Sequence, residues 1–175
     1  MKKKINYSED YLNERHIRNE FNTDYDDYNC GGYALKTFSW YRPYEYDKKN
    51  YPWHSLMDRI EYLVYGEGFD KEEAISILLE EHTKKMLEQF AETLRVVSLN
   101  THLEEGEELI AYRLSVLMDG EYIDDIDFHY IVFRAGKWRS KLGRQRIKPF
   151  QFTENPWKTE YFVYDSPIVY LAHKI

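Results

Sequence analysis

The feature that most constrains the fold is a change in the hydrophobic pattern near residue 94. Before it, apolar residues recur at helical spacing, most clearly over residues 70–92, where Asp70 and Glu73 have the spacing of a capping box. After it, residues 108–117 alternate between apolar and polar side chains, and residues 128–134 are strongly β-prone. This order predicts an α+β fold, with N-terminal helices packed on a C-terminal antiparallel β-sheet.

Shorter patterns predict the remaining elements. A first helix is expected to begin at Cys30 and to end before Pro43, because the residue that precedes a proline disfavours helical geometry. Asp119-Gly120 and Gly136 are typical turn residues. A second helix is expected over 55–65, a loop over 42–54, and further strands over 94–99, 137–142, 159–164 and 168–171.

Length and composition limit the class of protein. The chain has 175 residues, which is about the size of one domain, and its 43% of hydrophobic residues argues against global disorder. We therefore expect a single domain over 1–175. No apolar run is long enough for a transmembrane helix, and the Lys-rich start leads into polar residues, so a cytoplasmic location is expected.

The charge distribution bears on the class of partner. Lysine and arginine number 24 and aspartate and glutamate 31, which gives a net charge of −7 and argues against general membrane or nucleic-acid binding. Between Arg134 and Lys148, however, every charged residue is basic. This basic strip could contact an acidic substrate, or it could only keep a strand edge soluble, and it leaves nucleic-acid binding open.

Cys30 is the first candidate for chemistry. As the only cysteine it excludes an internal disulfide and a multi-cysteine zinc site. At the start of a helix its thiolate would be stabilised, and Gly31 and Gly32 would let a substrate approach the backbone and leave amides to face an oxyanion. The alternative is that Cys30 is a small buried apolar residue.

His129 is the second candidate, since a cysteine nucleophile needs an imidazole that takes and returns its proton. If Ala135-Gly136 is a two-residue turn, Phe133 faces Trp138 and the side chains of Asp127, His129 and Ser140 share one face of the sheet. Either Asp127 or Ser140 could then orient the imidazole. The alternative is a half-buried strand histidine.

These residues carry a family resemblance. A cysteine that starts a helix, Asp-x-His on a strand and a hairpin that returns through Trp138 resemble the NlpC-type papain-like cysteine peptidases. The span 127–143 also resembles a pattern of uncharacterised bacterial and phage proteins. The resemblance implies a papain-like fold, Cys30 as nucleophile, His129 as general base and Ser140 as the third polar residue. The long separation of Cys30 from His129 then implies a helical insertion around 55–92.

The function expected from these observations is that of a cysteine hydrolase or acyltransferase. It would cleave a peptide-like bond of a peptide or protein through a thioester, with no cofactor. The alternative is a catalytically inactive papain-like protein that binds a protein partner, such as a phage-encoded inhibitor. The other histidines lack ligand spacing, so no metal site is expected. Substrate contacts are expected from Tyr28, Gly31, Gly32, Trp138, Arg139 and Lys141.

Overall fold

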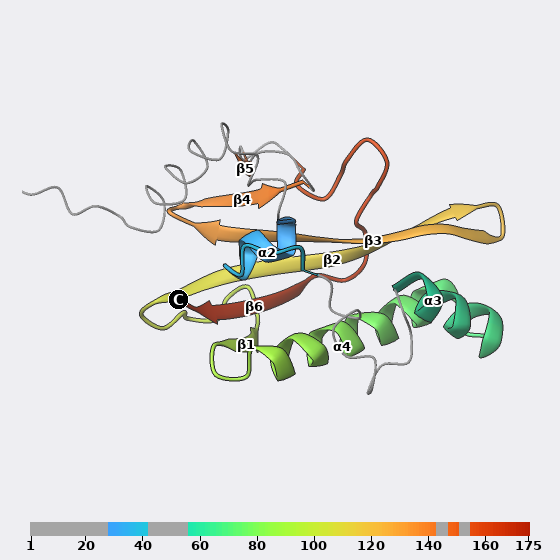
Figure 1. Cartoon of the computed structure of the whole chain (residues 1–175), viewed down its shortest axis with the longest axis horizontal. Helices are drawn as coiled ribbons and strands as arrows, with labels where there is room; N and C mark the ends of the chain where they lie inside the picture. The colour runs from blue at the N-terminus through green and yellow to red at the C-terminus, as the bar shows by residue number, and fades with distance from the viewer. Residues whose placement is uncertain (1–27, 42–55, 143–146, 151–154) are drawn as a thin grey trace, which may run out of the picture.

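A computed structural model describes residues 28–41, 56–142, 147–150 and 155–175 (Figure 1). These residues form a six-stranded antiparallel sheet in the order β1-β6-β2-β3-β4-β5, together with several helices. The predicted α+β class is confirmed. The elements are α2 (Cys30–Ala34), α3 (Leu56–Glu61), the π-helix η2 (Tyr62–Gly66), α4 (Lys71–Gln89), β1 (Leu94–Val97), β2 (Glu107–Asp119), β3 (Tyr122–Arg134), β4 (Lys137–Lys141), β5 (Ile147–Pro149) and β6 (Val169–Lys174).

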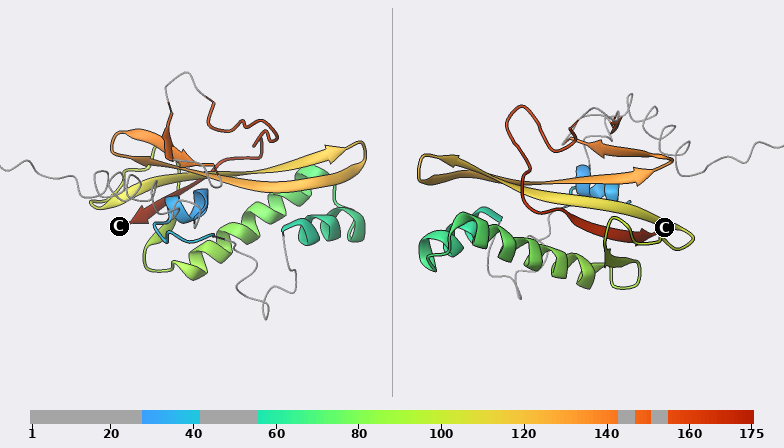
Figure 2. Two further views of the ribbon diagram at one scale, coloured as in Figure 1. Left: turned by 45° about the horizontal axis from the view of Figure 1, so that its top comes forward. Right: turned by 180° about the vertical axis from the view of Figure 1, so that it is seen from behind.

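The helices and the C-terminal chain cover opposite faces of the sheet. Figure 2 shows α3 and α4 along one face, while the part of the chain that precedes β6 crosses the other. On the helical face, Tyr112 of β2 donates a hydrogen bond to Leu79 O of α4 at 3.2 Å. On the other face, Arg113 Nε donates to Ser166 O at 2.6 Å and Ser115 Oγ to Val163 O at 2.7 Å. Alternate residues of β2 therefore serve two different layers.

The helical segment is part of the core of the protein. The predicted α4 is confirmed together with its capping box, in which Asp70 Oδ1 accepts from Glu73 N and Glu73 Oε2 accepts from Asp70 N. Ile60, Leu78 and Met86 of these helices are fully buried with residues of β2 and β3 in one apolar cluster. The segment predicted as an insertion thus supplies one layer of the core.

Two hairpins set the register of the sheet. The predicted Asp119-Gly120 turn joins β2 to β3, but β3 begins at Tyr122, earlier than the predicted 128. The acidic residues around Asp124 obscured this first part of the strand in the sequence. The second hairpin turns at Ala135-Gly136 and places Phe133 opposite Trp138, which confirms the predicted register.

Two sequence predictions about short elements were wrong, and one short strand was missed. The first helix ends after Ala34, because the chain reverses and brings Ser39 O so close to Gly32 that a Cβ there would lie 1.9 Å from it. Residues 159–164 form no strand, and only an isolated bridge joins Lys158 to Val163. The short β5 was missed. The predicted loop over 42–54, together with Pro43 and Gly143, lies outside the described residues.

His82 is a buried histidine in the contact between α4 and the sheet. Its Nε2 hydrogen-bonds the hydroxyl of Tyr130, and its ring packs against those of Tyr112 and Phe128. Burial disfavours the charged imidazolium and lowers the pKa of His82 to about 3. The histidine therefore stays neutral in the folded protein well below pH 6.5.

This burial predicts a loss of stability in mild acid. As the pH falls from 6.5 towards 3, the unfolded chain protonates this histidine and the folded protein does not, so the free energy of unfolding decreases by about 1.4 kcal/mol per pH unit for one such group. In urea denaturation between pH 7 and pH 4, His82→Phe should show a shallower pH dependence than the wild type. His102→Phe, a change at an exposed histidine, should keep the wild-type slope. Equal slopes for all three proteins would contradict the assignment.

Candidate active site

Asn29 fixes the position of Cys30 at the start of α2. Its Oδ1 accepts hydrogen bonds from Gly32 N at 3.0 Å and from Tyr41 N at 3.1 Å, and its Nδ2 donates to Tyr41 O at 2.9 Å. This N-cap ties the first turn of the helix to the returning chain. Amides in the first turn have no partner within a helix, so those of Cys30 and Gly31 take partners from outside it, and that of Gly31 faces the sulfur of Cys30.

Two buried cations hold the segment that carries Cys30 against the sheet. Arg134 of β3 pairs with Glu108 through Nε and Nη2 at 2.7 and 2.6 Å, donates to Ala34 O, and lies 4.8 Å from the centroid of the Tyr33 ring. Lys141 of β4 donates to Tyr28 O at 2.6 Å and lies 4.6 Å from the centroid of the Tyr28 ring. The two ends of this segment are therefore both anchored by charge-assisted contacts.

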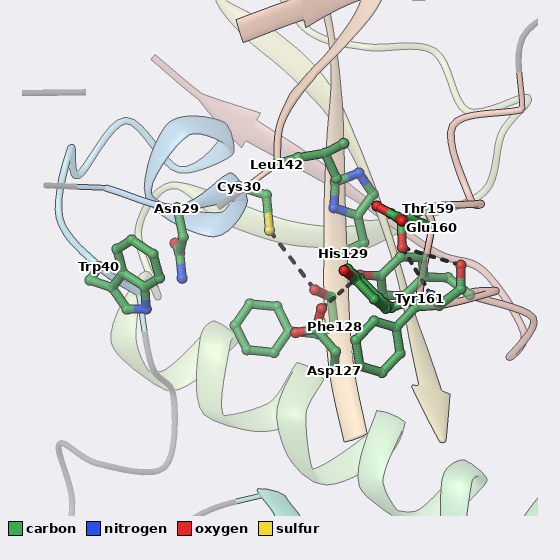
Figure 3. A pocket seen from close by; sticks show the side chains of 12 residues that line it. Asn29, Cys30, Trp40, Asp127, Phe128, His129, Leu142, Thr159, Glu160 and Tyr161 are labelled. Carbon is green, nitrogen blue, oxygen red and sulfur yellow. Dashed lines mark hydrogen bonds between the residues drawn. The ribbon is translucent and has the colours of Figure 1, made fainter. Parts of the chain in front are cut away.

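Cys30, Asp127 and His129 line one pocket of about 500 Å³ (Figure 3). Strand β4 pairs with β3 only over Val132–Arg134, so the earlier part of β3 presents an edge to α2. The Cys30 thiol donates to Phe128 O on this edge, at 3.9 Å. The remaining lining residues come from the Cys30 segment, from β3, from the end of β4 and from the C-terminal chain; they are Asn29, Trp40, Phe128, Leu142, Thr159, Glu160, Tyr161, Phe162 and Tyr164.

His129 reaches the pocket from the face of the sheet opposite to α4. Its ring lies 5.1 Å from that of Tyr164 and 6.1 Å from that of Trp157. Its Nε2 is buried and has no hydrogen-bond partner within the described part of the chain. Burial lowers the pKa of His129 to about 4, because the charged form would be desolvated. At neutral pH the imidazole is therefore uncharged and able to accept a proton.

Asp127 hydrogen-bonds a tyrosine. The hydroxyl of Tyr164 donates to Asp127 Oδ2 at 2.6 Å, and this tyrosine also packs on the ring of His129. Burial raises the pKa of Asp127, and the hydrogen bond from Tyr164 opposes that shift. Asp127 and His129 are thus linked through Tyr164. Sequence reasoning missed Tyr164, since nothing in the sequence distinguishes it from the other tyrosines.

Ser140 is not brought into the pocket. Its side chain is buried, and its Oγ has no hydrogen-bond partner among the described residues. The predicted hairpin register is correct, but β4 separates from β3 just beyond Arg139, so Ser140 pairs with Lys148 of β5 and does not follow His129 along the sheet. Ser140, which the family resemblance implies as the third polar residue, is therefore not placed beside His129 in this structure.

The residues predicted to contact substrate lie outside the pocket lining. Lys141 is 0% exposed and donates to Tyr28 O, and Tyr28 itself is buried against Phe38. Trp138 packs edge-to-face on Phe133 and lines a separate pocket on the sheet. Of the others, Gly31 is covered by the ring of Tyr41, Gly32 by the backbone at Ser39, and Arg139 donates to Arg134 O at 3.2 Å.

The thiol of Cys30 is not activated in this arrangement. Its side chain is 5% exposed, and burial together with the charge of Asp127 raises its pKa to about 12, although hydrogen bonds from the backbone of Tyr130 and Gly31 oppose the shift. The prediction of a thiolate stabilised by the helix start was therefore wrong for the protein without substrate. Burial raises the pKa of Cys30 by more than the five-residue helix α2 can lower it.

Comparison of the chain with protein-family models, with curated proteins and with solved structures gave no match in any of the three. Among the described residues, no group of three or more histidine, cysteine, aspartate or glutamate side chains is placed to hold a metal ion. None of the helices described is both long and apolar enough to cross a membrane.

The raised pKa of Cys30 predicts slow alkylation at neutral pH. Because iodoacetamide reacts with the thiolate, the rate at the single cysteine should keep rising above pH 8.5, where a free cysteine is already half ionised. Asp127→Asn removes a charge that raises this pKa and should accelerate the reaction at pH 8. Glu121→Gln makes the same change in net charge at an exposed site and should leave the rate unaltered. A titration midpoint below 8.5 in the wild type would contradict the neutral thiol.

The anchoring role of Lys141 predicts a selective loss of stability. Lys141→Met leaves the carbonyl of Tyr28 without its donor and should lower the free energy of unfolding by about 1–3 kcal/mol. Lys137→Met on the same strand removes an exposed cation and should cost about 0.5 kcal/mol or less. Urea denaturation of the two variants gives the comparison. Equal losses would show that Lys141 does not anchor the segment.

Proposed function

We propose that the protein is a papain-like cysteine hydrolase or acyltransferase that acts on a peptide-like bond. The observation that carries the proposal is the meeting of Cys30 and His129, from segments far apart in the sequence, at one open pocket. A nucleophile, a neutral imidazole and helix-start amides are the groups that thioester chemistry requires. The papain-like assignment rests on the helix-start cysteine and the strand histidine.

The reaction begins with proton transfer from Cys30 to His129 as Sγ attacks the substrate carbonyl. The carbonyl carbon becomes tetrahedral, and its oxygen takes the negative charge, which the amides of Cys30 and Gly31 stabilise. The imidazolium of His129 then protonates the leaving amine, the C–N bond breaks, and a thioester on Cys30 remains. Water, activated by the neutral His129, hydrolyses this thioester; in an acyltransferase a second amine takes the place of the water.

Attack requires the thiol to give up its resting hydrogen bond. In the protein without substrate the thiol donates to Phe128 O, and both Cys30 and His129 are neutral. Proton transfer is therefore concerted with attack and does not start from a stored ion pair. Tyr164 is the positioning residue for this step, since its ring packs on the imidazole and its hydroxyl binds Asp127.

The burial of Cys30 favours the competing function, a catalytically inactive protein that binds a protein partner. A thiol with a raised pKa whose proton is held by a backbone carbonyl is also the state expected of a cysteine that serves only in packing. The two functions differ in one measurable property, which is whether His129 accelerates the chemistry of Cys30.

Acylation of the lone cysteine tests the proposal. Peptide p-nitrophenyl esters offer an activated carbonyl, and the release of nitrophenol with the matching mass increase on Cys30 reports the thioester. We expect a burst in the wild type, none in Cys30→Ala, and a rate lower by roughly 10²–10⁴-fold in His129→Ala. His102→Ala, at an exposed histidine, should match the wild type. Equal acylation rates with and without His129 would reject the hydrolase and favour the binding protein.

A further inference from the structure

The pocket around Cys30 is lined by acidic residues and lacks basic ones. Asp127 and Glu160 both line it, and no lysine or arginine is among its lining residues in the described part of the chain. His129 is neutral at pH 7, since burial lowers its pKa to about 4. Lys141, which acts on Cys30 through its charge, is fully buried and donates to Tyr28 O. The charged side chains that line this pocket are therefore both acidic.

Aromatic rings make up much of the remaining lining. Trp40, Tyr161, Phe162 and Tyr164 contribute side chains from two separate parts of the chain. Tyr161 is 73% exposed, so its ring is available to a ligand, and the rings of Phe162 and Tyr164 stack with centroids 5.9 Å apart. The faces of such rings attract ammonium groups, and carboxylates beside them add a direct charge interaction.

A buried polar atom at this pocket, independent of the carboxylates, lacks a hydrogen-bond partner. His129 is 1% exposed, lines the pocket, and leaves Nε2 without a hydrogen-bond partner among the described residues. Buried polar atoms in folded proteins are normally satisfied, and a substrate that occupies the pocket is the natural source of the missing partner. Figure 3 shows Cys30 and His129 entering the pocket from different elements, with Thr159 and Glu160 beyond the histidine.

We propose that this pocket selects a substrate that carries an ammonium group, from a primary or methylated amine, close to the bond that Cys30 attacks. The reacting bond rests on the proposed function; recognition of the cation does not, since it depends only on the charges and rings of the pocket. Among the described residues of the basic strip between Arg134 and Lys148, only Leu142 lines the pocket, so the role of the strip stays a separate question.

Charged thiol reagents test the polarity directly, because Cys30 is the only cysteine. We compare the rate at which Cys30 reacts with the cationic aminoethyl methanethiosulfonate and with the anionic sulfonatoethyl methanethiosulfonate. The ratio of the two rates is divided by the same ratio for a small neutral thiol, 2-mercaptoethanol, which removes the intrinsic difference between the reagents. We expect a normalised ratio of at least roughly tenfold in favour of the cation at low ionic strength. Glu160→Gln should lower it by roughly fivefold, whereas Glu121→Gln, an equal charge change at the β2–β3 turn, should leave it unaltered. A normalised ratio near one would overturn the proposal.

Protection of Cys30 tests recognition of the whole group. N-acetyl-lysine methylamide should slow the reaction of Cys30 with the neutral methyl methanethiosulfonate at least fivefold more than the norleucine compound at the same concentration. Tyr161→Phe should keep this difference and Tyr161→Leu should reduce it; equal protection by the two compounds would overturn the proposal.

A cation preference without acylation by nitrophenyl esters would reject the hydrolase and retain the cation site. Acylation with no cation preference would retain the enzyme and reject this specificity.

Discussion

The guanidinium of Arg134 joins parts of the protein that are far apart in the sequence. It pairs with Glu108 of β2, donates to the backbone at Ala34 and lies against the ring of Tyr33, so that the sheet and α2 share one buried charge. A buried cation is tolerated only when its partners are in place, and the loss of one partner typically costs about 3–5 kcal/mol. The position of Cys30 relative to β3 therefore depends on this contact.

The second constraint is desolvation of the side chains of Cys30 and His129. Cys30 and His129 are both buried at the wall of the pocket, and burial shifts their pKa values in opposite directions, so that each stays neutral. A neutral thiol and a neutral imidazole at one pocket react slowly with electrophiles, because the thiolate is the nucleophile. In the proposed reaction, the substrate itself supplies the polar surroundings in which proton transfer becomes favourable.

Local patterns were sufficient to predict the larger elements. The capping box at Asp70 located the start of α4, and the Ala135-Gly136 turn fixed the register that sets Phe133 opposite Trp138. Both depend on residues that are close together in the sequence. The end of α2 could not be predicted in this way, because it is set by the return of the chain at Ser39 over Gly32.

The candidate site was predictable only in part, for the same reason. Cys30 was recognised by the two glycines that follow it, and His129 by its place after Asp127 on a predicted strand. The structure places both residues at one pocket. Tyr164 could not be recognised, since its contact with Asp127 joins residues 37 positions apart. Lys141 was expected to contact substrate, but it is buried and donates to a carbonyl 113 positions away, at Tyr28. Long-range contacts of this kind leave no periodic pattern in the sequence.

The separation of β4 from β3 has a consequence for self-association. A strand edge with unpaired backbone groups is a template on which another chain can add a strand. On this edge of β3, the Cys30 thiol donates to Phe128 O and its sulfur accepts from the backbone of Tyr130. The side chain thus takes up backbone groups that a neighbouring strand would otherwise pair. Any event that lifts α2 from the sheet would leave these groups open to a strand from another chain.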